Sequence, residues 1–164
     1  MKTLIQSKNL GQIESLILWG YIASKLGPSS HLKIQKLLYY IQWYHLAYFW
    51  EPIINDDFQA WVHGPVSKVF YDQVKGMSLL YWELKVKKDR DFSKDLKKTL
   101  TDDQVSLIDQ VLEMLWKYSW IELEGFTHWE KPWIDAREWF DPGEKCAKII
   151  SKESIKSFFK SRVA

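Results

Sequence analysis

The chain has 164 residues, with ten tryptophans, eight tyrosines and eight phenylalanines, so aromatic residues make up 16% of a composition that is otherwise ordinary for a globular domain. This length fits one domain, or one domain with a small appendage, and the single cysteine, Cys146, excludes a disulfide framework and every multi-cysteine zinc site. The net charge of +2 gives no overall attraction to nucleic acid, and lysines outnumber arginines, the side chains that favour specific phosphate and base recognition.

The start of the chain shows no targeting signal, because Lys2 and Lys8 flank only a short apolar patch without a cleavage site. The longest apolar stretch, residues 37–50, is too short for a membrane span of about 20 residues. We therefore expect a cytoplasmic protein that does not enter the membrane.

A first helix is predicted over residues 11–25. Its apolar residues recur at helical spacing on a single stripe. The stripe consists of Ile13, Leu16, Ile17, Gly20, Ala23 and Leu26. Gly27-Pro28 is expected to end the helix.

A second helix, residues 31–50, is the clearest element of the sequence, and Ser29 or Ser30 is its natural N-cap. Apolar side chains cover most of its circumference. Such a helix is expected at the centre of a domain, with neighbours on several sides.

One narrow strip of this helix is polar. Its members lie within roughly 80° on either side of one line along the helix. They are His31, Gln35, Tyr39, Gln42 and His45. If the helix is central, these groups need partners, because an unsatisfied buried amide costs about 1–3 kcal/mol. They either hydrogen-bond the backbone of a neighbouring loop or line a functional cleft, and the sequence leaves both readings open.

The next segments are less regular. Residues 58–62 favour a short extended segment, and Gly64 allows a turn with positive φ. Pro65 suits the first turn of a helix that ends near Val74. Residues 80–86 are rich in β-formers and suggest a strand or hairpin arm. Residues 85–98 carry a net charge of +4 and are predicted to form an exposed loop.

The second half of the chain again favours helices. Thr101 and Gln104 form a capping box before an amphipathic helix. The side chains expected to face inward are Val105, Ile108, Val111, Leu112 and Leu115. An aromatic, helix-rich stretch runs from Trp120 to a turn at 141–143. Ser151 is expected to cap a last helix, and residues 145–162 carry a net charge of +5.

The predicted fold is therefore mainly α. It is a single compact multi-helix domain around the central helix 31–50, with a short β-hairpin as an optional addition. Residues 1–144 form the domain in this prediction, and residues 145–164 form a basic C-terminal helix packed on it or extending from it.

No catalytic motif is present: the sequence lacks the nucleophile elbow, the phosphate-binding glycine loops and the H-E-x-x-H zinc pattern. The four histidines are scattered without metal-ligand spacing, so a structural role is the first interpretation of His128. Lys145 and Lys148 flank Cys146 and would make an exposed thiol there more reactive, but an inert cysteine is the commoner case. A small hydrolase or metal-dependent enzyme around His63 and His128 is the least supported hypothesis, and we expect no enzyme, cofactor or metal.

Binding offers two further hypotheses. The two lysine-rich segments could contact phosphates, although charged, solvated surfaces are the simpler interpretation, so a nucleic-acid-associated phage or repressor-like protein is the second hypothesis. Protein binding fits better, because tryptophan and tyrosine dominate interface hot spots. The tryptophans in excess of framework needs are Trp82, Trp116, Trp120, Trp129 and Trp139.

Residues 33–71 carry a specific pattern. It reads K-I-Q-K-L-L-Y-Y-I-Q from Lys33 to Gln42, then A-W-V-H-G-P-V from Ala60 to Val66. A Thr-His pair at 127–128 and a Pro-Trp pair at 132–133 follow. This pattern resembles the Panacea domain, or SocA-like antitoxin domain, a family often found in phage-associated proteins. The resemblance spans roughly residues 16–137.

The resemblance implies a mostly α-helical antitoxin that neutralises its toxin by direct protein binding. Its partner would be a cognate toxin encoded by the adjacent gene, and at least one type of member delivers its toxin to a protease. The residues that the motif and the polar strip mark as motif or partner-binding positions are Gln35, Tyr39, Gln42, His45, Trp61, His63, Gly64, Pro65, Thr127, His128, Trp129 and Trp133.

The sequence departs from the family pattern in three places. Trp50 stands where the family usually has glycine, Lys68 replaces a frequent proline, and residues after Arg137 match no family pattern. From the residues alone, Gln35, Gln42 and His45 are expected to bind backbone groups of the 58–66 segment.

Overall fold

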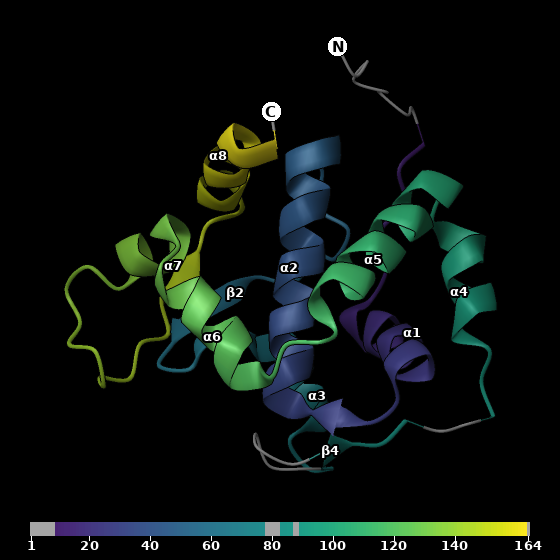
Figure 1. The fold of residues 1–164 in the computed structure, drawn as a ribbon, viewed down its shortest axis with the longest axis horizontal. Coiled ribbons are helices and arrows are strands. Elements are labelled where there is room, and N and C mark those ends of the chain that lie inside the picture. Colours follow the sequence, from purple (N-terminus) through teal and green to yellow (C-terminus); the bar gives the residue numbers. More distant parts are fainter. Residues whose placement is uncertain (1–8, 78–82, 87–88, 164) are drawn as a thin grey trace.

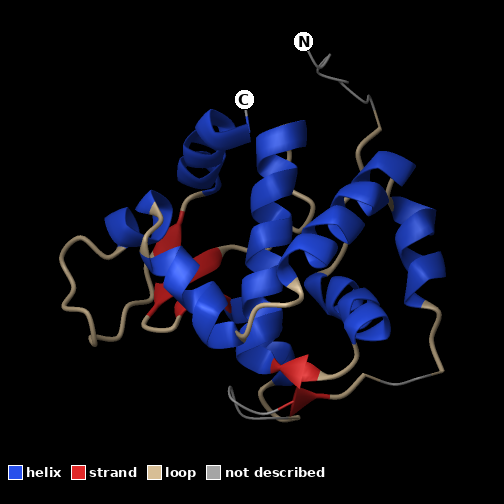
Figure 2. Cartoon of the chain, in the orientation of Figure 1, coloured by secondary structure: helices blue, strands red, loops and turns tan. Residues whose placement is uncertain are grey.

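A computed structural model describes residues 9–77, 83–86 and 89–163. Of the described residues 59% are helical, and they form eight helices and a few short strands (Figure 2). The prediction of a compact, mainly α fold is confirmed.

Helix α2, His31–Phe49, runs through the middle of the molecule (Figure 1). It begins where the Ser30 hydroxyl accepts a hydrogen bond from the Lys33 amide at 3.2 Å. Fifteen of its nineteen residues are buried. Helices α1 (Ser15–Leu26), α5 (Asp102–Leu115), α6 (Trp120–His128) and α8 (Lys152–Val163) all pack against it. The central position predicted for this helix is confirmed.

Helix α1 begins four residues later than predicted, and its buried face is rotated. Leu18 and Ile22 are fully buried, whereas Leu16 and Ile17 of the predicted stripe are only half-buried. The backbone before the helix makes other bonds. The Ile13 amide donates to the Ile53 carbonyl at 2.8 Å, and this tertiary contact keeps residues 11–14 out of the helix.

An antiparallel sheet beside α2 has the strand order β3-β2-β5 and contains β2 (Phe58–Trp61), β3 (Gly64–Ser67) and β5 (Ile149–Ile150). Pro65 lies in β3 opposite Ala60, so the predicted helix start at Pro65 is wrong. An edge strand tolerates proline, which has no amide to donate to a ladder. Helix α3, Lys68–Val74, begins only after Ser67, whose hydroxyl accepts from the Phe70 amide at 3.1 Å. Gly64 has φ +90°, as the predicted turn requires.

A second, two-stranded pairing joins β1 (Ser29–Ser30) to β4 (Glu83–Leu84). The rest of the strand predicted from residue 80 lies outside the described residues, apart from 85–86. The exposed loop predicted for 85–98 is wrong from Phe92 onward, because Phe92–Thr99 forms helix α4. Asp91 caps this helix, and Phe92 and Leu96, at i and i+4, are buried.

The remaining helices follow their capping signals. Both bonds of the capping box at Thr101 and Gln104 are present, and all five side chains predicted to face inward from α5 are buried. Helix α7, Lys131–Ala136, follows α6, and the Ser151 hydroxyl accepts from the Ser154 amide at the start of α8. Because α8 packs on α2 and β5 pairs with β2, the C-terminal segment contacts the rest of the fold at two places. The division of the chain at residue 144 stays a prediction.

The polar strip of α2 is buried and bonds to neighbouring segments. Gln35 exchanges two hydrogen bonds with the backbone of Ser67, at 2.9 and 3.2 Å. The side chain of Gln42 does the same with the loop after α2, accepting from the amides of Ile53 and Ile54 and donating to the Ile54 carbonyl at 2.9 Å. The expected target, residues 58–66, is therefore wrong for Gln42, and Gln35 reaches the residue just beyond it.

His45 also bonds outside the expected segment. Its Nδ1 lies 2.5 Å from the Glu51 carbonyl, and its Nε2 lies 2.9 Å from Nε2 of Gln104 in α5. A neutral ring that donates from Nδ1 and accepts at Nε2 satisfies both contacts. Burial lowers the pKa of His45 to about 4, in agreement with a neutral imidazole. Gln104 bonds the backbone of Gly11 as well, so this side chain links α5, α2 and the N-terminal segment.

None of the helices in the described part of the chain is both long and apolar enough to cross a membrane.

Gln42→Met is expected to destabilise the fold strongly, while Tyr39→Phe should be neutral or stabilising. The first change leaves three buried backbone groups of Ile53 and Ile54 without partners, at about 1–3 kcal/mol each. The second removes a buried hydroxyl that has no hydrogen-bond partner among the described residues. Urea unfolding of both variants measures the difference, and a Tyr39→Phe loss as large as that of Gln42→Met would contradict this account.

Trp50→Gly is expected to be more stable than Trp50→Ala by about 1 kcal/mol. Trp50 ends α2 in the left-handed region at φ 64°, where a Cβ atom is unfavourable. Both variants lack the indole, over which Lys160 lies at 3.9 Å from the ring centroid, so the loss of its contacts cancels in the comparison. Thermal and urea unfolding test the order, and equal stabilities would show that the backbone is not strained at this residue.

Candidate functional site

The two halves of the sequence motif meet where the β2–β3 turn touches α2 and α6. Lys36 is completely buried, and its Nζ donates to the Pro65 carbonyl at 3.2 Å. A Cβ atom on Gly64 would lie 2.7 Å from Thr127 Oγ1 and 2.9 Å from Lys36 Cε, so only glycine fits between them. Burial lowers the pKa of Lys36 to about 7, and the negative charge of Glu124 opposes this shift. This part of the motif therefore locks the hairpin against the two helices.

At the surface of this contact, His63 and His128 approach the same carboxylate. Nδ1 of His63 lies 3.1 Å and Nε2 of His128 lies 3.6 Å from Oε1 of Glu124. Burial lowers the pKa of His128, and the charge of Glu124 acts against this shift. Within the described residues, no group of three or more His, Cys, Asp or Glu side chains could hold a metal ion.

Trp133 and Arg137 attach the segment after α6 to the sheet. The Trp133 indole donates to the Trp61 carbonyl at 3.0 Å and stacks on His128, with ring centroids 4.1 Å apart. The buried Arg137 guanidinium donates to the Ala60 carbonyl at 2.7 Å. The motif residues from β2, α6 and α7 thus form one connected framework.

The structure therefore separates the predicted site residues into three groups. Those near the turn come together, and they are Trp61, His63, Gly64, Pro65, Thr127, His128 and Trp133. A second group is buried along the length of α2, and it comprises Gln35, Tyr39, Gln42 and His45. Trp129 stands apart from both groups, because it lines a groove on another side of α6.

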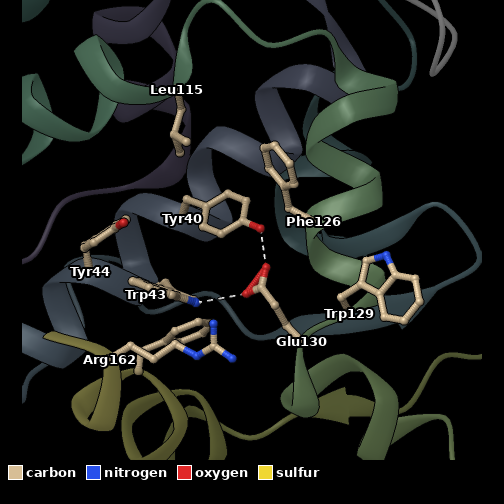
Figure 3. Close-up of a pocket in the computed structure, with 9 residues that line it drawn as sticks. Tyr40, Trp43, Tyr44, Leu115, Phe126, Trp129, Glu130 and Arg162 are labelled. Carbon is tan, nitrogen blue, oxygen red and sulfur yellow. Dashed lines mark hydrogen bonds between the residues drawn. The ribbon is translucent and has the colours of Figure 1, made fainter.

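This groove, which we call the aromatic groove, has a volume of about 480 Å³. It lies between α2, the end of α5, α6 and α8, and most of its walls are rings (Figure 3). Its lining residues are Tyr40, Trp43, Tyr44, Leu115, Phe126, Trp129, Glu130, Phe159 and Arg162.

The carboxylate of Glu130 is the polar centre of the aromatic groove. Glu130 is only 8% exposed, and it receives hydrogen bonds from the Tyr40 hydroxyl and, at 3.3 Å, from the Trp43 indole (Figure 3). Burial raises the pKa of Glu130 to about 7, although the Tyr40 bond and the charge of Arg162 act in the opposite direction. Glu130 is also the N-cap residue of α7, but its side chain does not cap that helix.

Sequence reasoning missed Lys36, Arg137 and the groove role of Glu130. The first two lie inside or next to the motif, where a charged residue among apolar ones could have indicated a buried bond. Glu130 comes two residues after the Thr-His pair, but nothing in the local pattern shows that it faces Tyr40 and Trp43, which lie 90 and 87 residues earlier in the chain.

The tryptophans expected to exceed framework needs are mostly exposed. Trp129 is 85% exposed, Trp139 80% and Trp116 55%. Trp120 is half-buried, and Trp82 lies outside the described residues.

The motif framework and the aromatic groove thus belong to one mainly helical domain. Residues 34–134, more than half of the chain, match the model of the Antitoxin SocA-like, Panacea domain family. The chain belongs to this family. Neither the comparison with curated proteins nor the comparison with solved structures gave a match.

The pKa of Glu130 predicts a stability difference that depends on pH. The native carboxyl holds its proton up to about pH 7, whereas the unfolded one loses it near 4.5. The wild type should therefore lose, relative to Glu130→Gln, up to about 3 kcal/mol as pH rises from 4.5 to 8. His31 and His45, whose pKa values burial lowers to about 4, are present in both proteins and cancel in the difference. Urea unfolding of both proteins at several pH values tests this, and parallel pH profiles would contradict it.

Proposed function

We propose that this protein is an antitoxin that neutralises a cognate protein toxin by binding it directly, and not by catalysis. Membership of the SocA-like antitoxin family supports the general role. The cognate toxin would be the product of the neighbouring gene.

The observation that carries this proposal is the apolar surface of α6. Ile121 is 63% exposed, Phe126 43% and Trp129, the C-cap residue of the helix, 85%. With the helix extended by that one residue, the three fall within about 140° of its circumference. The opposite side of the same helix buries Leu123 and Thr127. Exposed apolar groups that cluster on one side of an element mark an interaction site, and tryptophan is the side chain most enriched in hot spots. We call Ile121, Phe126 and Trp129 the α6 surface.

The basic groups of the C-terminal segment support protein binding over nucleic acid. Lys152 pairs with Asp57 at 2.7 Å, and Lys156 and Lys160 lie over the Trp50 ring. These cations already have partners within the chain. A nucleic-acid ligand would have to compete with those contacts.

Co-expression with the neighbouring gene product tests the proposal. The wild-type chain should restore growth and form a complex on gel filtration. Ile121→Asp and Trp129→Ala should each weaken that complex at least about tenfold, because they remove exposed anchors without touching the core. Val69→Asp is the matched control: Val69 is also aliphatic and helical, with an exposure of 51%, but it lies on α3.

Failure of the wild-type chain to rescue growth and to form a complex would sink the proposal. Equal weakening by Val69→Asp would show that the α6 surface is not the contact. The half-life of the toxin in cells separates two modes of action. Direct neutralisation leaves it unchanged, whereas delivery to a protease, the mode implied for at least one type of family member, shortens it.

A further inference from the structure

The floor of the aromatic groove carries a carboxyl group that no ion pair within the described part of the chain neutralises when it is charged. The oxygens of Glu130 accept from two neutral donors, Tyr40 and Trp43. Among the described residues, Glu130 forms no ion pair within 4.0 Å. A carboxylate removed from water in this way gains strongly from a cation placed beside it.

The one basic side chain among the groove-lining residues is Arg162, from the last turn of α8. Its guanidinium lies over the Phe158 ring, 4.4 Å from the centroid, and its charge lowers the pKa of Glu130. Arg162 is itself exposed. Arg162 therefore reaches the groove from the solvent side. It acts on Glu130 by long-range electrostatic attraction and forms no ion pair with it.

The aromatic walls of the groove also favour a positively charged ligand. Tyr40 and Trp43 meet edge to face, and the Phe126 and Trp129 rings stand on the opposite wall (Figure 3). Aromatic faces attract cations, and the attraction grows when water is removed. Arginine suits such a site better than lysine, because its planar guanidinium stacks on rings and can bond both oxygens of a carboxylate.

We propose that the aromatic groove receives an arginine side chain of the partner protein, which displaces Arg162, stacks against Trp129 and Phe126, and forms an ion pair with Glu130. That the partner is a toxin rests on the function proposed above. The cation specificity of the groove stands on its own geometry. The α6 surface borders the groove through Phe126 and Trp129, so one partner segment can cover both.

A blocked arginine tests the groove without knowledge of the partner. N-acetyl-arginine amide is titrated into the full chain, with N-acetyl-citrulline amide as the uncharged isostere. The indole N–H signal of Trp43 is followed by NMR, because this group donates to Glu130. The arginine probe should shift the signal in a saturable way, and the citrulline probe should bind at least about tenfold more weakly. Equal binding of the two probes would overturn the proposal.

Three variants assign the contacts. Arg162→Ala should bind the arginine probe severalfold more tightly, because it removes the internal competitor. Glu130→Gln should bind at least about tenfold more weakly while keeping an oxygen that Tyr40 can bond. Arg90→Ala is the control. Arg90 precedes α4 and pairs with Asp95 of that helix, so this variant should bind the probe as the wild type does. Weaker binding by Arg162→Ala, or unchanged binding by a folded Glu130→Gln, would refute the assignment. If Glu130→Gln does not fold, the two probes on the wild type decide.

The pH dependence adds an independent readout. The groups that face Glu130 are Tyr39, Tyr40 and Tyr44 from α2 and Arg162 from α8. The tyrosine pKa values are raised by burial, so these hydroxyls stay neutral below pH 10. With the pKa of Glu130 at about 7, affinity for the arginine probe should rise severalfold from pH 6 to pH 8. A flat profile would count against an ion pair with Glu130.

The complex with the neighbouring gene product then tests the source of the arginine. Replacing each exposed arginine of that product by alanine should reveal one position whose effect is not additive with Glu130→Gln. Full additivity at every position would overturn the proposal while leaving direct neutralisation intact. Concentration-dependent dimers that Glu130→Gln abolishes would assign the groove to a second copy instead, and would also overturn it. If the chain neutralises nothing, the probe titrations still decide whether the groove binds arginine.

Discussion

The structure depends on one constraint: α2 is covered on nearly every side, and its polar side chains must find their partners inside the protein. Gln35 bonds the backbone of β3, Lys36 the Pro65 carbonyl, and Gln42 the loop that follows α2. Each of these bonds fixes a short strand or a loop against the helix. Because a buried polar group without a partner costs about 1–3 kcal/mol, each segment has one favourable position against the helix. The central helix therefore has two roles: it forms much of the core, and its polar side chains position the neighbouring segments.

The position of these segments also determines which side of α6 is exposed. Gly64 packs directly against Thr127 on the inner side of that helix, and the Trp133 indole bonds the backbone of β2 just beyond it. With this side held against the hairpin, the α6 surface is turned outward. The motif residues are mainly internal. The side chains that we propose as partner contacts, the α6 surface, lie on the opposite side of the helix that the motif residues hold in place.

Glu130 shows a conflict between stability and binding. Burial among aromatic rings removes water from the Glu130 carboxylate and makes its charged form unfavourable, which is why its pKa is raised to about 7. An apolar residue would avoid this cost, and burying a charge adds little to the stability of a fold. Sites that violate the rules of packing in this way are often functional. The exposed Arg162 reduces the cost without forming an ion pair, so the groove can still gain from a stronger cationic partner.

The sequence by itself determined the elements whose signals are local. Ser30, the capping box of Thr101 and Gln104, and Ser151 begin helices where their side chains can bond the first free amides, and this geometry involves only a few consecutive residues. The nearly continuous apolar circumference of residues 31–50 likewise indicated a central helix. Tertiary structure alone decided the rest. Pro65 entered an edge strand because β2 lies beside it, the start of α1 moved because Ile13 bonds Ile53, and Glu130 met Tyr40 across ninety residues of chain. These outcomes depend on which distant groups become neighbours, and only the packing of the whole chain around α2 sets that.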